Sequence, residues 1–326
     1  RPDSCWACWP RGRRAPRLRR ARRPCRARAE DLSAWSSEFA YAGGTVLRPW
    51  DHFTGRWGAI SRQLEQAFGA GPRGEPFRLV DLGSNRGFFS LQAALRHPNA
   101  EVIGVEGSAG VGNGKVGPDG GAPAIVETEA VRTHLDWASR LGLRNCLVAP
   151  EVWDYARVRE LAASGRRLCD AMLLLSVVHH VHRLSRGQYP VQDADESDGL
   201  VDLLAEILNL ASLHFVELPG PRDLRGAYKA HGSQRALLEA AASASGRPWR
   251  LAGPLHTAKW FGQRELWELR DESPEPRPLW PREDAFSRLE HPPAVVPPLP
   301  QRRPTRNKRQ RRGGRQGQSH SHTRIR

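Results

Sequence analysis

Two carboxylates separated by a glycine turn are the residues of this chain whose types and spacing best suit ligand binding. Asp81 closes a short apolar run and is followed by Gly83 and Gly87, and Glu106 closes the next apolar run, 25 positions after Asp81. Small residues let a ligand approach the backbone, and an acid at the tip of the second strand can accept both hydroxyls of a ribose. The spacing therefore predicts a nucleoside site.

The turn differs from the fingerprint of dinucleotide-binding proteins. It reads Asp-x-Gly-x-x-x-Gly instead of Gly-x-Gly-x-x-Gly, so it opens with Asp81 where a pyrophosphate would be repelled. A ligand that carries an amino group and a positive sulfonium would instead be attracted. The residues thus favour a cationic nucleoside over a dinucleotide.

At these residues the chain resembles the class I S-adenosylmethionine-dependent methyltransferases, and the resemblance covers about residues 75–270. It implies an enzyme that uses S-adenosyl-L-methionine. Because the chain lacks the Asp/Asp-Asn set that would hold a divalent metal, we expect a metal-independent reaction. The residues that the resemblance assigns to this cofactor are Asp81, Gly83, Ser84, Asn85, Gly87, Glu106 and Ser176. An acid after the third strand should approach the adenine edge, and Glu151 and Asp154 are equal candidates.

The segment from Cys169 to His180 resembles the fourth strand and the start of the catalytic loop of that family. A histidine there can take a proton from a hydroxyl group as it is methylated. Adjacent residues of a strand point in opposite directions, so at most one of His179 and His180 faces the substrate, and we favour His180. Glu217 closes the fifth strand, where it either orients a histidine, binds the acceptor hydroxyl or forms a salt bridge.

Missing motifs narrow the methyl acceptor. The fourth strand is followed neither by the Asn/Asp-Pro-Pro-aromatic turn of base N-methylation nor by a Pro-Cys pair, and residues 30–80 contain no Lys for a ribose-methylating tetrad. A hydroxyl of a small molecule or saccharide remains the favoured acceptor. One alternative is an RNA methyltransferase whose basic tails bind phosphates. Another is a cofactor-binding, inactive scaffold domain.

The order of apolar segments predicts the fold that positions these residues. Short apolar runs alternate with helical patterns of ten or more residues, which is typical of an α/β fold with a mostly parallel sheet. The resemblance implies a seven-stranded sheet with helices on both faces. We expect a disordered Arg-rich segment at 1–29, a small helical N-terminal cap at 30–74, the methyltransferase domain at 75–271 and a disordered Pro/Arg-rich tail at 272–326.

The predicted elements set the boundaries to be compared with the structure. The strands are expected at 77–82, 101–105, 146–148, 171–178, 213–218, 249–251 and 265–269. The helices are expected at 57–68, 86–96, 125–141, 153–163, 200–211 and 233–243. The residues between 107 and 123 are rich in glycine, which predicts a loop.

Net charge and cysteine content indicate the setting of the protein. Residues 1–29 and 301–326 each carry +10, so residues 30–300 sum to −5 of the total +15. Five scattered cysteines predict a reducing compartment, and no apolar run approaches the ~20 residues of a membrane span. We expect an intracellular protein, cytoplasmic or organellar, because the Arg-rich start partly resembles a transit peptide. We expect a monomer or weak dimer.

Overall fold

A computed structural model of the 326-residue chain describes residues 39, 42–43, 46–47, 50–107, 121–190, 196–259, 263–275 and 277–294. The chain divides into two units, Arg1–Ala294 and Val295–Arg326, and the second lies outside the described residues, as does the segment 1–38. Among the helices of the described ranges, none is both long and apolar enough to cross a bilayer.

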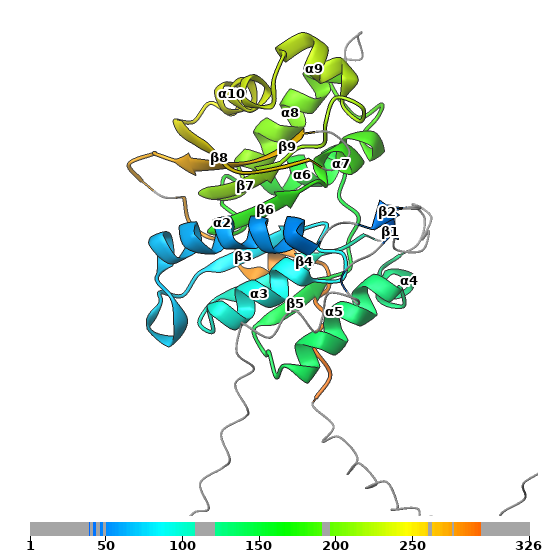
Figure 1. The fold of residues 1–326 in the computed structure, drawn as a ribbon, viewed down its shortest axis with the longest axis vertical. Coiled ribbons are helices and arrows are strands. Elements are labelled where there is room, and N and C mark those ends of the chain that lie inside the picture. The colour runs from blue at the N-terminus through cyan, green and yellow to red at the C-terminus, as the bar shows by residue number, and fades with distance from the viewer. Residues whose placement is uncertain are drawn as a thin grey trace, which may run out of the picture. The chain divides into compact units, whose positions relative to one another are not determined.

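A seven-stranded sheet organises the first unit, in the order β5-β4-β3-β6-β7-β9-β8 (Figure 1). The strands are β3 (Arg78–Leu82), β4 (Glu101–Val105), β5 (Cys146–Ala149), β6 (Ala171–Leu175), β7 (Leu213–Glu217), β8 (Trp249–Lys259) and β9 (Gln263–Asp271). Neighbouring strands from β5 to β7 are parallel, and β9 is antiparallel to both β7 and β8. The predicted seven-stranded, mostly parallel fold is confirmed.

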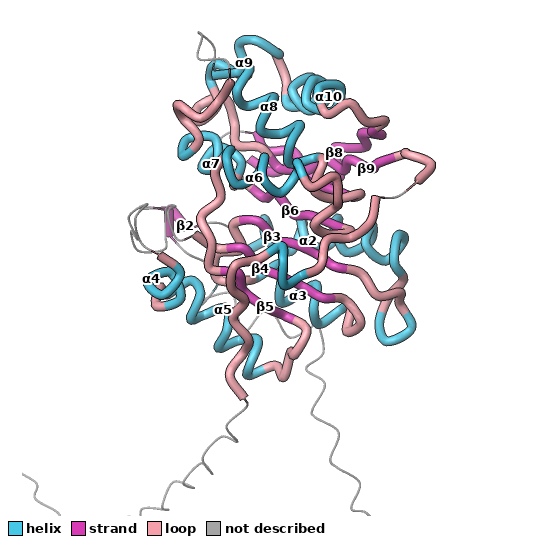
Figure 2. Tube along the Cα trace, turned by 180° about the vertical axis from the view of Figure 1, so that it is seen from behind, coloured by secondary structure: helices cyan, strands magenta, loops and turns pink. Residues whose placement is uncertain are grey.

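Helices cover both faces of this sheet, because each central strand is apolar on both sides. Alternate residues of β3 enter different cores: Leu79 packs with α2 (Trp50–Phe68), α3 (Phe88–Arg96) and α5 (Glu129–Arg140). Val80 instead enters the core of the opposite face. The helices there are α6 (Tyr155–Ala163), α7 (Val178–Leu184), α8 (Glu196–Leu208), α9 (Arg225–His231) and α10 (Gln234–Ala244). Figure 2 shows α6, α7 and α8 from this side.

The parallel strands all end at one edge of the sheet, and the chain changes direction across it between β3 and β6. From β3 the chain proceeds outward to β4 and β5, and it then returns to β6 on the other side of β3. In open α/β sheets the crevice beyond the strand ends at such a switch point is where ligands bind. Residues that follow β3, β4 and β6 are therefore brought together at this edge.

The N-terminal helix is longer than predicted and belongs to the main domain. α2 begins at Trp50 instead of residue 57, and it packs against α3 and β8. Its buried residues Phe53, Ile60 and Leu64 join the same core as Leu79 of β3. The described part of the predicted cap is therefore one of the helical layers. A short hairpin, β1 (Ala42–Gly43) with β2 (Val46–Leu47), precedes it.

Other elements differ from prediction where an apolar pattern continues past a break. The single helix predicted at 125–141 is two helices, α4 (Ala122–Val126) and α5, with Thr128 immediately before the second. The strand predicted at 171–178 ends at Leu175, and α7 begins at Val178. The predicted short strand at 249–251 is the first part of the 11-residue β8.

The C-terminal segment 277–294 packs against the domain, so the disordered tail predicted from residue 272 starts too early. Arg167 donates its backbone N–H to Pro278, and Glu290 pairs with Val148 on the edge strand β5. The segment includes the short helix α11 (Arg282–Ala285) and crosses behind the sheet in Figure 1, in orange. Covering the edge of β5 satisfies backbone groups that an edge strand would otherwise expose.

Candidate functional site

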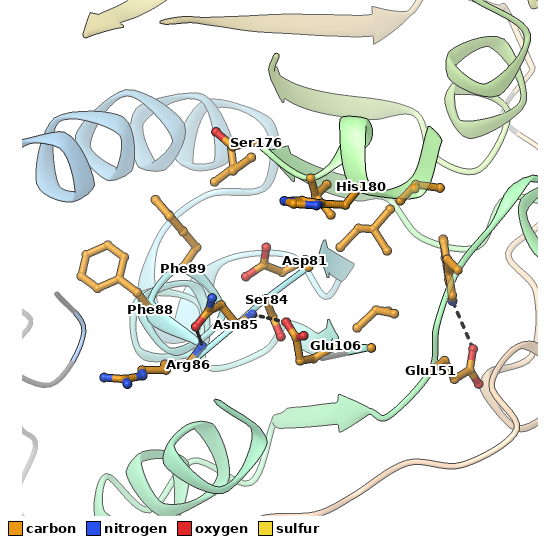
Figure 3. Close-up of a pocket in the computed structure, with 18 of the residues that line it drawn as sticks. Asp81, Ser84, Asn85, Arg86, Phe88, Phe89, Glu106, Glu151, Ser176 and His180 are labelled. Carbon is orange, nitrogen blue, oxygen red and sulfur yellow. Dashed lines mark hydrogen bonds between the residues drawn. The ribbon is translucent and has the colours of Figure 1, made fainter. Parts of the chain in front are cut away.

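A cavity lies at the switch point of the sheet, between the ends of β3, β4 and β6 (Figure 3). It contains about 1020 Å³ of space, including its open mouth. Small-molecule sites enclose roughly 300 to 1000 Å³. Of the residues predicted from sequence, eight line it: Asp81, Gly83, Ser84, Asn85, Glu106, Glu151, Ser176 and His180.

The two predicted glycines are needed for different reasons. Gly83 has a φ of +72°, and a Cβ there would lie 2.5 Å from Cγ2 of Val177, which lines the cavity. Gly87 has a φ of +86° and precedes α3, and its Cβ would meet the buried ring of His134 at 2.3 Å. Gly83 therefore lets Val177 approach the turn closely, whereas Gly87 lets α3 pack closely on α5. Gly87 does not itself line the cavity.

Hydrogen bonds fasten the turn to the tip of β4. Gly83 and Ser84 both donate their backbone N–H groups to the carbonyl of Val105, at 2.8 and 3.1 Å. The N–H of Asn85 donates to Oε2 of Glu106 at 2.6 Å. A carboxylate offers about four acceptor positions, so this bond orients Glu106 and leaves acceptor capacity. Figure 3 shows the Glu106 side chain beside Ser84 and Asn85 in the cavity.

Asp81 is the buried carboxylate of the site. Only 2% of its surface is exposed, and Ser90 of α3 donates its hydroxyl to Oδ2 at 2.7 Å. Burial, with a smaller contribution from the nearby Glu106 carboxylate, raises the pKa of Asp81 to about 6 in spite of the opposing Ser90 hydrogen bond. At neutral pH the ionised form is therefore held at an energetic cost that a cationic ligand would relieve.

The hydroxyl of Ser84 is buried and has no hydrogen-bond partner within the described residues. A buried polar atom without a partner costs free energy that a ligand can recover. Ser84 lies in the cavity between Asp81 and Glu106 in Figure 3. The site therefore offers a hydroxyl donor and acceptor beside two carboxylates in one cavity, which suits a ligand with both hydroxyl and amino groups.

Of the two candidate acids after β5, Glu151 lines the cavity and Asp154 does not. Asp154 caps α6 by accepting from the N–H of Arg157 at 2.9 Å, and it does not line the cavity. Glu151 lines it, and its oxygens accept from Trp153 at 3.1 Å and from the backbone N–H of Ser287 at 2.7 Å. The C-terminal segment thus holds Glu151 at the rim, and Asp154 has a structural explanation.

The paired histidines lie on a helix, not on a strand or loop. His179 and His180 occupy the first turn of α7, where successive side chains point about 100° apart instead of in opposite directions. His180 lines the cavity, whereas His179 packs against its ring, with the centroids 3.9 Å apart. Burial, and then the charge of Arg183, lowers the pKa of His180 below its ordinary value. The imidazole is therefore neutral at pH 7.

Glu217 does not line the cavity and belongs to a buried charge cluster behind it. Its carboxylate lies 3.3 Å from Nη1 of the fully buried Arg56 and 3.8 Å from that of Arg264, and it accepts from the hydroxyl of Ser176. Arg264 also donates to the Ser176 hydroxyl at 2.6 Å. Although burial opposes ionisation, Arg56 and its neighbours hold the pKa of Glu217 below its ordinary value.

Ser176 links this charge cluster to the cavity. It has a φ of +60°, an uncommon conformation for a residue with a side chain, and its N–H donates to the carbonyl of Glu217. The sequence allows three roles for Glu217: orienting a histidine, binding the acceptor hydroxyl and forming a salt bridge. Its contacts with Arg56 and Arg264 are those of a salt bridge at the end of a strand. His256 packs against Gly55 of α2 and Lys259 is exposed, and neither lines the cavity.

We expect Glu217→Gln to destabilise the protein by about 3 kcal/mol, because it removes the carboxylate that faces two buried guanidiniums. Thermal unfolding should shift downward by several degrees. Glu239→Gln is the matched control, since Glu239 forms an exposed pair with Arg235 on α10 and should change stability by less than about 0.5 kcal/mol. Equal melting temperatures for the two variants would contradict this structural role.

Sequence reasoning missed the aromatic part of the cavity. Phe39, Phe53, Phe88 and Phe89 line it together, from the N-terminal segment, α2 and the start of α3. The consecutive phenylalanines directly after Gly87 were an available signal. The buried Arg56 was not, because arginine in a helical pattern ordinarily marks an exposed face. Across the described ranges, no group of three or more metal-ligating side chains gathers.

No protein-family model matches the chain, and no curated protein matches it. Among solved structures, the bifunctional kinase-methyltransferase WbdD is 17% identical with a TM-score of 0.44, over 74% of this chain and 42% of WbdD. The chain thus spans less than half the length of that protein. Magnesium protoporphyrin IX methyltransferase from Synechocystis PCC 6803, solved with bound SAM, is 14% identical over 74% of this chain and 92% of its own, with a TM-score of 0.43.

The methyltransferase domain of bacterial Hen1 is 13% identical over 67% of this chain and 98% of its own, with a TM-score of 0.36. Similarities at these levels do not establish an activity. The strand order and the cavity at the switch point define the fold independently of these comparisons. The chain has an open α/β fold with a seven-stranded, mostly parallel sheet.

Proposed function

We propose that the protein is an S-adenosylmethionine-dependent methyltransferase that methylates a hydroxyl group of a small molecule or saccharide. The observation that carries this proposal is the set of groups around the glycine turn. Two buried carboxylates, Asp81 and Glu106, and the unpartnered hydroxyl of Ser84 meet in one cavity at the switch point of the sheet.

Each residue of the site has a role that fits this cofactor. Asp81 would hold the amino group of the methionyl part, because its buried carboxylate gains from a nearby positive charge. Glu106 would accept from the ribose hydroxyls, and Glu151 with Trp153 would form the adenine end. When bound, the cofactor supplies a methyl group on a sulfonium, which passes to the acceptor oxygen while the carbon–sulfur electron pair stays on sulfur.

The protein's own contribution to the reaction is positioning and proton removal. His180 lines the cavity with a neutral imidazole, so it can accept the proton that the acceptor hydroxyl loses. Ser176 and Val177, which follow β6, also line the cavity, where they would contact the acceptor. Glu217 acts through Ser176 and is a positioning residue in this proposal.

Incubation with methyl-labelled cofactor and a cell extract tests the proposal. After fractionation into RNA, protein and small metabolites, we expect the label in the small-metabolite fraction. Label confined to RNA would contradict the acceptor class and favour an RNA methyltransferase. Deletion of residues 1–29 and 301–326 should leave methylation of the small acceptor unchanged, since the proposed site does not include those residues.

A further inference from the structure

The cavity has two ends of different chemistry. The carboxylates and the turn hydroxyl lie toward Glu106 and Glu151, and the four phenylalanines line another part of the wall. Figure 3 shows Phe88 and Phe89 on the side away from Glu151, with Ser176 and His180 along the adjoining wall. If the polar groups hold the cofactor, as proposed above, the aromatic end is where the acceptor lies.

The aromatic end is a rigid surface built from rings that pack on one another. The Phe88 ring meets those of Phe53, Phe89 and Phe39 edge to face, with centroids 5.2, 5.0 and 5.8 Å apart. The guanidinium of Arg56, which does not line the cavity, lies 4.9 Å from the centroid of Phe89. These contacts hold the rings in place before any ligand arrives, which reduces the entropy that binding must overcome.

The polar groups at the aromatic end are few, and most of them already bond to other side chains of the protein. The Ser176 hydroxyl contacts Glu217 and Arg264, and the guanidinium of Arg86 pairs with Glu129 at 2.6 Å. A saccharide placed here would lose hydrogen bonds to water from several hydroxyls without replacing them. An aromatic ring would instead bury apolar surface and make edge-to-face contacts of its own.

The base points to the same class of acceptor. A neutral imidazole is a weak base, so it accepts a proton more readily from an acidic hydroxyl. A phenolic hydroxyl has a pKa near 10, as in tyrosine, and is far more acidic than a saccharide hydroxyl. The weak base and the aromatic wall of the cavity therefore both favour a phenolic hydroxyl over a saccharide hydroxyl.

We propose that the methyl acceptor is a planar aromatic molecule with a phenolic hydroxyl, whose ring packs against Phe53, Phe88 and Phe89 and whose hydroxyl faces His180. This inference rests on the proposed function and narrows its acceptor from small molecules and saccharides in general to phenols.

Calorimetric titration of 2-naphthol and of methyl glucoside into the protein saturated with S-adenosylhomocysteine tests the inference. We expect 2-naphthol to bind and methyl glucoside not to bind. Phe89→Leu should weaken 2-naphthol binding about three- to tenfold while S-adenosylhomocysteine binding stays within twofold. The matched control is Phe77→Leu, since Phe77 is equally buried in the same core, stacks on Phe68 and does not line the cavity.

Each other outcome overturns the inference. Methyl glucoside binding as tightly as 2-naphthol would assign the aromatic end to saccharides, and equal naphthol affinities for the two variants would remove Phe89 from the acceptor site. If Phe89→Leu lost affinity for S-adenosylmethionine but not for 2-naphthol, the phenylalanine rings would bind the cofactor sulfonium instead of the acceptor. If S-adenosylhomocysteine itself fails to bind the wild-type protein, the proposed function fails, and that result is distinguishable from all of these.

Discussion

Replacing Asp81 with Asn should make the protein more stable and at the same time weaken its binding of S-adenosylhomocysteine at least tenfold. Burial raises the pKa of Asp81 from 3.8 to about 6, so the ionised carboxylate destabilises the folded state above that pH. Two pKa units correspond to about 3 kcal/mol. Asn has a similar shape and still accepts the Ser90 hydrogen bond, but it offers no charge to the cofactor amino group.

The pH dependence follows from the direction of this shift. When the pKa of a carboxyl group is higher in the folded than in the unfolded state, the folded protein loses stability as pH rises between the two pKa values. The stability advantage of Asp81→Asn should therefore be absent near pH 3.8, grow up to about pH 6 and stay constant above it.

Chemical denaturation across this pH range, with calorimetric titration of S-adenosylhomocysteine at pH 7.5, measures both effects. Asp136→Asn is the control, because Asp136 is exposed on α5 and should change neither quantity. An Asp81→Asn variant that is less stable at pH 7.5, or that binds with wild-type affinity, would contradict the role given to this carboxylate.

Replacing His180 with Ala should lower turnover by about 10²- to 10⁴-fold, which is the usual contribution of a general base. The affinity for S-adenosylhomocysteine should stay within twofold, because the groups that the proposal assigns to the cofactor lie on β3, on the glycine turn and after β4 and β5, and none lies on α7. His179→Ala is the control: His179 packs on His180 but does not line the cavity, so we expect less than a tenfold loss.

Turnover of the wild-type protein should depend on pH through the same imidazole. Burial, Arg183 and Arg264 lower the pKa of His180, and Asp223 only partly opposes them. The base must be neutral, so activity should fall on the acid side at a pH below 6.5, and His180→Ala should lose this limb. Single-turnover rates with 2-naphthol, or with the acceptor isolated from extract, would measure it. If the fall in turnover on the acid side is unchanged in His180→Ala, His180 is not the base.

Local sequence pattern predicted the parallel strands because each is apolar on both faces. Alternate residues of β3 and β4 enter opposite cores, which requires continuous apolar runs, and these runs stand out between glycine turns. The Asp81-to-Glu106 spacing brings both carboxylates to one cavity for the same reason, since Asp81 lies near the end of β3 and Glu106 directly follows β4.

The break between β6 and α7 could not be predicted in this way. The run from 171 to 178 is apolar throughout except Ser176, and what ends the strand is tertiary: Ser176 is held at positive φ by bonds to Glu217, 41 residues later. His180 is carried into the cavity by that break. A larger separation in sequence explains why the burial of Arg56 was not predicted, since its carboxylate partner is 161 residues away.

The choice between Glu151 and Asp154 was also beyond local pattern. Both acids follow β5 within a few residues, and either could approach the strand end. The contact that fixes Glu151 comes from Ser287, in a segment whose Pro-rich composition predicted disorder. Long-range contacts of this kind can be read from the folded chain only.

Calorimetric titration of S-adenosylhomocysteine into the wild-type protein and Glu106→Ala tests the central claim most directly. The account predicts one site per chain in the wild type and at least tenfold weaker binding in Glu106→Ala. The exposed Glu160, which pairs with Arg157 on α6, supplies the control Glu160→Ala with wild-type affinity. Absence of binding to the folded wild-type protein at ligand concentrations up to about 1 mM, the upper end of ordinary substrate affinities, would contradict the account.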